Sequence, residues 1–210
     1  MNPTLLTSEP AVQGSDEWLL ERSGRVTASN ADKVMMAKTT AGYQGYLTQL
    51  ALERLFGRPV ETFKNKAMER GNELEDTARM RYMLATRNNV SEAFFVPHET
   101  IMAGASPDGY VGKDGLVEFK CPLAHNHYHV LKNGTVPNTY KWQVAMQQWI
   151  TGRQWTDFVS FSDEFPPNAA LAIIRVERDE EMIADLEDKV VRFLEEVERT
   201  VEFIKNYRSK

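Results

Sequence analysis

Apolar residues recur at every third or fourth position in six stretches of the chain, and this spacing predicts amphipathic helices. The stretches are residues 15–22, 26–35, 44–56, 65–85, 139–151 and 179–204. The last stretch is the longest, and we expect its apolar face to pack on the domain's own sheet. That face carries Ile183, Leu186, Val190, Phe193, Val197, Val201 and Ile204.

Alternating apolar and polar residues predict strands between these helices, in residues 116–120, 157–162 and 171–178. Residues 91–105 are expected to form two strands, or one strand bent at Pro97. The mixture of strands and helices predicts a single α/β domain over residues 1–210, with a mixed central sheet flanked by helices and a long C-terminal helix. Residues 1–14 lack periodicity and are expected to form a loose arm.

The composition is typical of a globular protein, since 42% of the residues are apolar and 26% are charged. No apolar run approaches the length of a membrane-spanning helix, so we expect no membrane partner. The single cysteine, Cys121, cannot form an internal disulfide, which favours a reducing compartment. These features together lead us to expect a cytoplasmic protein.

The net charge of −5 does not by itself favour a nucleic-acid partner. The acidic excess, however, lies in residues 151–210, whereas acidic and basic residues balance in the first 150. The charge distribution therefore permits DNA binding by the first part of the chain.

The segment SPDGYVGKDGLVEFKCP, residues 106–122, carries the strongest chemical signal. Alternation along 116–120 places Glu118 and Lys120 on the same face of a strand. A hairpin turn before this strand can bring Asp108 beside them. The sequence alone also allows a surface hairpin whose charged side chains are solvated.

Two carboxylates this close repel each other, and a divalent cation removes the conflict. Hard oxygen ligands from Asp108 and Glu118 suit Mg²⁺ or Mn²⁺, and the carbonyl of Phe119 is a possible third protein ligand. Lys120 would then hold the attacking water or stabilise the charge that develops on phosphorus.

The order Asp, gap, apolar, Glu, apolar, Lys is the PD-(D/E)xK nuclease pattern. The longer string resembles the lambda-exonuclease-like group of YqaJ-type viral recombinases. This resemblance implies a restriction-endonuclease-like fold and a hydrolase that acts on DNA, with two metal ions per site. One departure is visible, because the basic residue that the family places shortly after Lys-Cys-Pro is replaced here by His125 or Asn126.

A second motif lies near the N-terminus, where a Trp is followed by Arg22, a Gly and the run Thr27-Ala-Ser29. A helix beginning at Thr27 or Ser29 beside Arg22 and Arg25 is a candidate phosphate pocket; the alternative is helix capping next to surface arginines. The resemblance implies that Arg22, Ser29 and Ser106 bind the 5′-terminal phosphate of DNA.

In the predicted helix 65–85, Glu75 borders the buried stripe, but Glu73 and Asp76 lie close by and the pattern does not choose among them. Glu75 is alternatively an exposed partner of Arg79. The family motif G-x-x-x-E matches Glu75, which the resemblance assigns to support of the metal-bound waters. Met68 matches the family's strand-separating wedge; the alternative is a residue packed in the core or at an interface.

In the helix 139–151, Tyr140 and Gln143 lie on one strip and can meet a common target. The family's active-site helix has the same Y-x-x-Q-V pattern, which places Gln143 with the catalytic residues and Tyr140 with the phosphate-binding ones. The alternative for Gln143 is a surface amide.

The histidines of LAHNHYHVLKNG suggest a zinc site at first sight. On a helix only His125 and His129 share a face, and nothing nearby completes a tetrahedral set. We expect His125, His127 and His129 to be polar positions that face the DNA groove.

The expected function is a Mg²⁺-dependent exonuclease that degrades one strand of duplex DNA to mononucleotides, and the resemblance implies that degradation starts at the 5′ end. The resemblance further implies a ring-shaped homotrimer and, in a phage or prophage, recombination with a single-strand annealing protein. Two alternatives are an endonuclease of the same superfamily and a non-catalytic module that binds DNA or a partner. The second would normally lack Asp108, Glu118 or Lys120, and all three are present.

Overall fold

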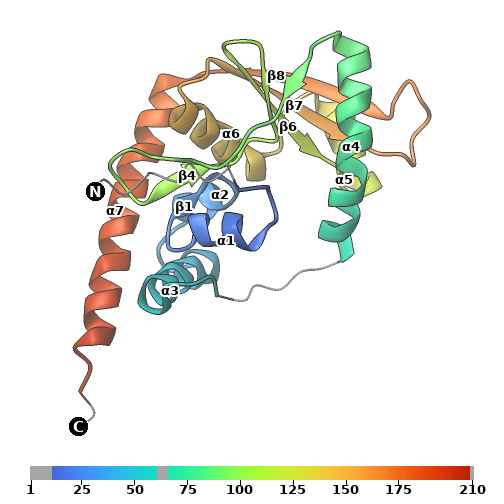
Figure 1. The fold of residues 1–210 in the computed structure, drawn as a ribbon. Helices are drawn as coiled ribbons and strands as arrows, with labels where there is room; N and C mark the ends of the chain where they lie inside the picture. The colour runs from blue at the N-terminus through green and yellow to red at the C-terminus, as the bar shows by residue number, and fades with distance from the viewer. Residues whose placement is uncertain (1–10, 61–65, 209–210) are drawn as a thin grey trace, which may run out of the picture.

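Two β-sheets form the framework of the computed structural model, which describes residues 11–60 and 66–208, with the side chains of 66–72 excepted (Figure 1). The larger sheet has the strand order β2-β5-β6-β7-β8. Its strands are β2 (Val90–Ser91), β5 (Gly109–Val111), β6 (Gly115–Lys120), β7 (Trp155–Phe161) and β8 (Leu171–Glu177). Strands β6 and β7 are parallel and the other pairs are antiparallel, so the sheet is mixed.

The smaller sheet has the order β1-β4-β3, formed by β1 (Val26–Thr27), β4 (Ala103–Ala105) and β3 (Val96–Pro97). Strand β1 is parallel to β4, and β3 is antiparallel to it. The region 91–105 therefore contributes to three short strands in two sheets, where two strands or one bent strand were expected. A side chain at Gly104 would clash with the Phe95 ring and a Val96 carbonyl, so glycine is required for this close packing.

The helices of the first half of the chain have clear boundary signals. They are α1 (Asp16–Arg22), α2 (Ala31–Met35), α3 (Ala41–Phe56) and α4 (Lys66–Thr86). Helix α3 begins where the Thr40 hydroxyl accepts from the Tyr43 N–H, and it ends at Gly57, which takes the left-handed conformation at φ +63°.

The prediction that one helix spans 26–35 with Thr27 or Ser29 as its N-cap is wrong. Val26 and Thr27 pair with β4, a 3₁₀ turn occupies Ala28–Asn30, and α2 follows it. The Thr27 hydroxyl accepts a bond from the Asn30 side chain, so it does not cap the turn. Pairing with β4 explains the late helix start, because strand geometry excludes helical backbone at these residues.

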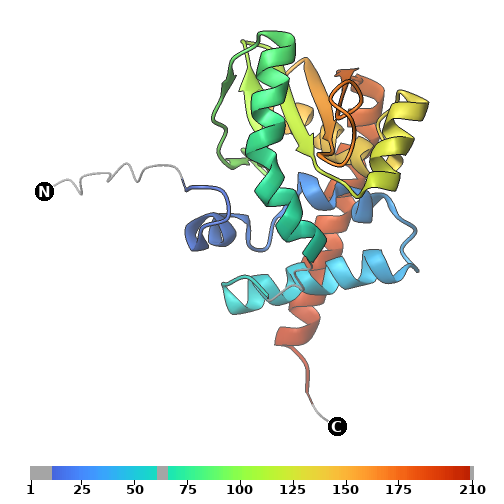
Figure 2. The same ribbon diagram turned by 90° about the vertical axis from the view of Figure 1, so that its right-hand side faces the viewer.

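The helices of the second half are α5 (Ala124–Asn133), α6 (Asn138–Thr151) and α7 (Glu180–Lys205). Helix α4 covers one face of the larger sheet and α6 lies on the other (Figures 1 and 2). Alternation along β6 therefore turns Val117 and Phe119 toward α4, and Glu118 toward α6.

Helix α6 is buried on most of its circumference, although its sequence predicted one apolar stripe. Ala145 and Met146 belong to the core shared with α3 and α7, while Val144 packs on Phe158 of the sheet. The two tryptophans of the predicted stripe are only partly buried at its edge.

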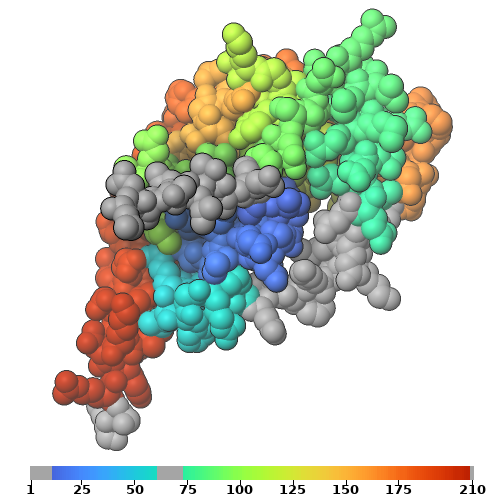
Figure 3. Space-filling model, viewed as in Figure 1, coloured from blue at the N-terminus to red at the C-terminus, as the bar shows by residue number. Residues whose placement is uncertain are grey.

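Helix α7 packs against α2, α3 and α6, so the expectation that it covers a sheet is wrong. The predicted stripe is buried from Ile183 to Val201, whereas Ile204 is 38% exposed because the helix extends past its partners. The C-terminal part of α7 projects from the body as a column (Figures 1 and 3).

The architecture confirms the expected α/β class, with a mixed sheet, flanking helices and a long C-terminal helix. None of the helices described in the structure is long and apolar enough to cross a bilayer.

Candidate active site

The carboxylate of Glu118 is the centre of a buried polar cluster at the end of β6. Its side chain is 1% exposed and receives three donors. The Lys120 Nζ and the Gln143 Nε2 each lie 2.5 Å from Oε1, and the Gln147 Nε2 lies 2.5 Å from Oε2. A carboxylate removed from water needs such donors to offset the cost of its burial.

Asp108 lies in the short linker between β4 and β5, next to this cluster. Its Oδ2 accepts the Phe119 N–H at 2.7 Å, just beyond the last paired residues of β5 and β6, Gly109 and Val117. Because the N–H and C=O of one strand residue point toward the same side, the Phe119 carbonyl points to the side of the strand on which Asp108 lies. This orientation fits its predicted role as a third protein ligand.

The electrostatics show the conflict that the sequence predicted. Burial and the negative charge of Glu118 hold the pKa of Asp108 well above its usual range. Burial alone would lower the pKa of the Lys120 ammonium, but attraction to Glu118 and Asp108 outweighs it and the net pKa is raised. One ammonium therefore compensates only part of the clustered negative charge.

Glu75 borders the cluster from α4, whereas Glu73 and Asp76 are exposed. Burial raises the pKa of Glu75. Attraction to Arg79 opposes this rise, and repulsion from Glu118 adds to it. The predicted pair with Arg79 is also present, at 3.5 Å. Arg79 in turn donates to the backbone carbonyl of Asp108 at 2.7 Å, so Glu75 is linked to the site through Arg79. Its support of metal-bound waters stays a prediction.

Helix α6 supplies the other wall of the cluster. Gln143 is 8% exposed, so the surface-amide alternative is wrong. The Lys120 Nζ lies 5.1 Å from the centroid of the Tyr140 ring, which places Tyr140 beside the ammonium. Sequence reasoning missed Gln147; its spacing of four residues from Gln143 on one helix was the available signal.

A second polar group unites three distant segments. The Ser106 hydroxyl accepts bonds from the Trp18 Nε1 at 3.0 Å and from the Arg22 Nη1 at 3.1 Å. The Arg22 Nη2 donates to the Ser29 hydroxyl at 3.2 Å, and the guanidinium lies 3.9 Å from the Trp18 ring centroid. The structure thus brings together three of the four residues predicted to bind the phosphate, and adds Trp18. The fourth, Tyr140, lies beside Lys120 instead.

Arg22 is partly enclosed by these contacts. Burial lowers the pKa of its guanidinium to about 10, with opposing contributions from Tyr46 and Glu53, so it remains a cation at neutral pH. A cation with a hydroxyl on each side and a restrained orientation is suited to binding a terminal phosphate.

The turn after Arg22 is fixed by α3. The Gly24 N–H donates to the Glu53 Oε2 at 2.7 Å, and the Arg54 Nε donates to the Gly24 carbonyl at 2.9 Å. Gly24 has φ +71°, a conformation that other residues rarely adopt. Helix α3 therefore determines where Arg22 lies.

The histidine prediction is wrong for His127, which is fully buried. Its Nδ1 lies 2.8 Å from the Ser160 hydroxyl and its Nε2 lies 2.8 Å from the Ala169 carbonyl. His125 and His129 are exposed. Within the described residues no group of three or more His, Cys, Asp or Glu side chains is arranged to hold a metal ion.

That finding bears on the carboxylate cluster as well as on zinc. A cation at Asp108 and Glu118 would complete its coordination with a backbone carbonyl and water, which suits Mg²⁺ and not zinc. The wedge prediction for Met68 lies outside the described side chains.

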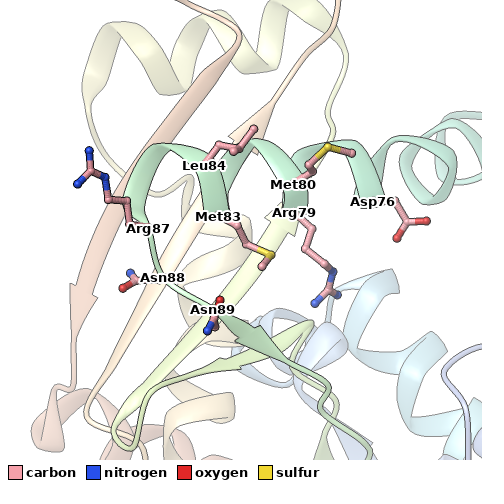
Figure 4. A pocket seen from close by; sticks show the side chains of 8 residues that line it. All are labelled: Asp76, Arg79, Met80, Met83, Leu84, Arg87, Asn88 and Asn89. Atoms are coloured by element: carbon pink, nitrogen blue, oxygen red, sulfur yellow. The ribbon is translucent and has the colours of Figure 1, made fainter.

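An open groove of about 460 Å³ follows the outer side of α4 (Figure 4). Arg79 lines this groove and also donates to the Asp108 carbonyl, so the groove and the site share this one residue. The groove is lined by Asp76, Arg79, Met80, Met83, Leu84, Arg87, Asn88 and Asn89.

A mixed α/β fold with Asp108, Glu118 and Lys120 gathered at the end of a central strand defines a nuclease. The chain belongs to the family of YqaJ-like viral recombinase domains, whose sequence pattern matches residues 17–154. No curated protein sequence matches the chain.

Among solved structures, the chain is similar to LHK-Exo, an alkaline exonuclease from Laribacter hongkongensis, with 42% identity and a TM-score of 0.85. LHK-Exo in complex with dAMP gives 42% identity and a TM-score of 0.86. In both cases the match covers 91% of this chain and 96% of the other. A phage-related exonuclease from Haemophilus somnus 129PT, at 17% identity, shares the fold, with a TM-score of 0.68 and coverage of 86% and 96%.

Proposed function

We propose that the protein is a divalent-metal-dependent exonuclease that degrades one strand of duplex DNA from a 5′-phosphorylated end and releases mononucleotides. The observation that carries the proposal is that Ser106 lies only two residues before Asp108. Ser106 contacts Arg22 in the cluster predicted to bind the phosphate, and Asp108 contacts the end of β6 in the carboxylate cluster. A bound terminal phosphate would therefore lie close to the groups that cleave the next bond.

Asp108, Glu118 and the Phe119 carbonyl would hold the metal, which we take to be Mg²⁺, with Mn²⁺ as a substitute and two ions per site. The fit is supported by the hard oxygen donors and by the raised pKa of Asp108, since a cation removes its repulsion with Glu118. When bound, the metal would lower the pKa of a coordinated water and neutralise charge on the phosphate.

The protein groups around it orient the reactants. Lys120 donates a hydrogen bond to the attacking water and stabilises negative charge that develops on the phosphate. Glu75, at the border of the cluster, accepts hydrogen bonds from neighbouring water, while Gln143 holds the Glu118 carboxylate. Tyr140, whose ring centroid lies 5.1 Å from the Lys120 Nζ, contributes to binding of the 5′ phosphate at the same edge.

Arg22, Ser29 and Ser106 bind the 5′ phosphate through the guanidinium and the two hydroxyls. Trp18 stacks on Arg22 and fixes its plane. Met68, ahead of Glu75 on α4, is assigned to separation of the terminal base pairs. The dAMP complex of LHK-Exo supports a mononucleotide as the product class, since that protein is 42% identical to this chain.

The remaining assignments rest on family membership. We infer a homotrimeric ring around duplex DNA, a cytoplasmic location, and a role in phage or prophage recombination together with a single-strand annealing protein.

The proposal is tested on 5′-phosphorylated linear duplex and on closed circular DNA, each with Mg²⁺ and with EDTA. Mononucleotides should be released from the linear duplex in Mg²⁺ only, and the circle should remain intact. Nicking of the circle would favour the endonuclease alternative, and binding without hydrolysis of either substrate would favour the non-catalytic one.

A further inference from the structure

Gln147 occupies a position that packing alone does not explain. Its side chain is fully buried in α6, and its Nε2 donates to the Glu118 Oε2 at 2.5 Å. Its own Oε1 is buried and has no hydrogen-bond partner among the described groups. An amide left half-satisfied in a core costs free energy that an aliphatic side chain of the same length would not.

The geometry of Glu118 shows what the amide does. Gln143 and Lys120 both donate to Oε1, and Gln147 donates to Oε2. The two glutamines lie one helical turn apart and donate to different oxygens of the Glu118 carboxylate. Without Gln147 both donors would act on a single oxygen, and the carboxylate could rotate about the bond that joins it to the side chain.

We propose that Gln147 is a positioning residue that fixes the plane of the Glu118 carboxylate for a divalent cation. The inference rests on the proposed function, in which Glu118 is a metal ligand. Groups that orient a metal ligand contribute to metal affinity without touching the metal, and their removal typically weakens binding by about 10- to 100-fold.

A matched control stands one residue away. Gln148 is 1% exposed on the same helix and donates to the Thr156 hydroxyl at 3.1 Å and to the Val176 carbonyl at 3.0 Å. Its amide therefore bonds to the sheet, and none of the described hydrogen bonds joins it to Glu118. Gln147→Met and Gln148→Met therefore remove the same buried amide from the same helix, and only the first removes a bond to the carboxylate.

The test is a titration of the full chain with Mn²⁺, in which electron paramagnetic resonance measures the concentration of free Mn²⁺ at each step. We expect Gln147→Met to raise the dissociation constant of Mn²⁺ by about tenfold. Gln148→Met should leave the constant unchanged and lower only the melting temperature. With DNA, Gln147→Met should raise the Mg²⁺ concentration for half-maximal rate and leave the KM for 5′-phosphorylated ends unaltered.

Each outcome decides one hypothesis. If the unaltered protein binds no Mn²⁺, the metal site of the proposed function is wrong. If the unaltered protein and Gln147→Met bind Mn²⁺ equally, the positioning role is wrong, and it is also wrong if both variants weaken binding alike. Should Gln147→Met fail to fold, Gln147→Asn, whose amide is one methylene too short to reach Glu118, is expected to give the same tenfold weakening.

Discussion

At the scale of single residues, Lys120 is the residue whose charge we expect to matter most for hydrolysis. Its ammonium contacts Glu118 at 2.5 Å and lies over the Tyr140 ring, so its position is fixed from two sides. Lys120→Met keeps the length of the side chain and removes the charge. We expect the rate of hydrolysis to fall by about 10²- to 10⁴-fold, while binding of DNA ends persists.

Single-turnover release of label from a 5′-labelled duplex measures this loss. Lys113→Met, in the exposed turn of the same hairpin, serves as the control and should retain the full rate. Undiminished hydrolysis by Lys120→Met would remove Lys120 from the mechanism.

Arg22 supports a prediction about discrimination between ends. Arg22→Gln removes the guanidinium that bridges the Ser106 and Ser29 hydroxyls. Hydrogen bonds to a charged group contribute about 1.5–3 kcal/mol, so the preference for phosphorylated over hydroxyl ends should fall by about 10- to 100-fold. The ratio of kcat/KM for the two substrates is the measurement.

Hydroxyl-ended duplex is the internal control in this experiment, because the variant and the unaltered protein should degrade it equally. Retention of the full preference for phosphorylated ends by Arg22→Gln would show that the phosphate is held elsewhere.

At the scale of elements, α4 is anchored to the larger sheet by a buried bond. The Tyr82 hydroxyl donates to the Asp157 Oδ2 at 2.7 Å, and Arg175 contacts both oxygens of the same carboxylate at 2.9 and 3.0 Å. Tyr82→Phe should lower the free energy of unfolding by about 1.5–3 kcal/mol at pH 8, through loss of a hydrogen bond to a charged group.

This contribution of Tyr82 depends on pH. Burial and the bond to Asp157 raise the pKa of Tyr82 to about 12, above the value of about 10 for an unfolded chain. The stabilisation is therefore complete below pH 10 and is lost as the pH rises through 12. Denaturant unfolding between pH 8 and 12 should show the two proteins converging, and a constant difference would contradict the assignment. Tyr128→Phe, at a half-exposed position, should change nothing.

The sequence determined some of these elements well because their signals are local. Period-two alternation requires Glu118 and Lys120 to share a face, whatever the rest of the fold does. The end of α3 at Gly57 and of α6 at Gly152 follows from the left-handed conformation that each glycine adopts. The contact of Arg22 with Ser29 and Ser106 was predictable only through family resemblance, since Arg22 and Ser106 lie far apart in the chain.

Other features depended on tertiary contacts that no local pattern encodes. Strands of two or three residues, such as β1 and β3, are too short to show alternation. His127 appears polar in sequence, yet Ser160 and a distant carbonyl satisfy both its nitrogens. The stripe of α7 shows that one face is buried, but it cannot show whether a sheet or other helices cover it.

At the scale of the whole molecule, charge and shape are unevenly distributed. Helix α7, whose exposed residues are mostly acidic, lies along one edge of the body and projects from it, whereas β6, which carries Glu118, lies inside the body away from this projecting end (Figure 1). Repulsion between α7 and DNA would favour approach of a duplex end from the side of the cluster.

The proposed ring gives a prediction at this scale. Sedimentation equilibrium should give a mass three times the chain mass of 24.0 kDa at the concentrations used for nuclease assays. A fully active protein that sediments with the mass of one chain would contradict the homotrimer and leave the chemistry of the site unaffected.

The linker Ser106-Pro107-Asp108 joins the smaller sheet to the larger one and has a consequence for product length. Two peptide units separate Ser106, proposed to bind the 5′ phosphate, from Asp108, proposed to bind the cation. Pro107 restricts the backbone between them. The backbone would thus set the distance between the bound 5′ phosphate and the cleaved bond at one nucleotide. One glycine inserted after Pro107 lengthens the span from Ser106 to Asp108 by up to about 3.6 Å, and dinucleotides should then appear among the digestion products.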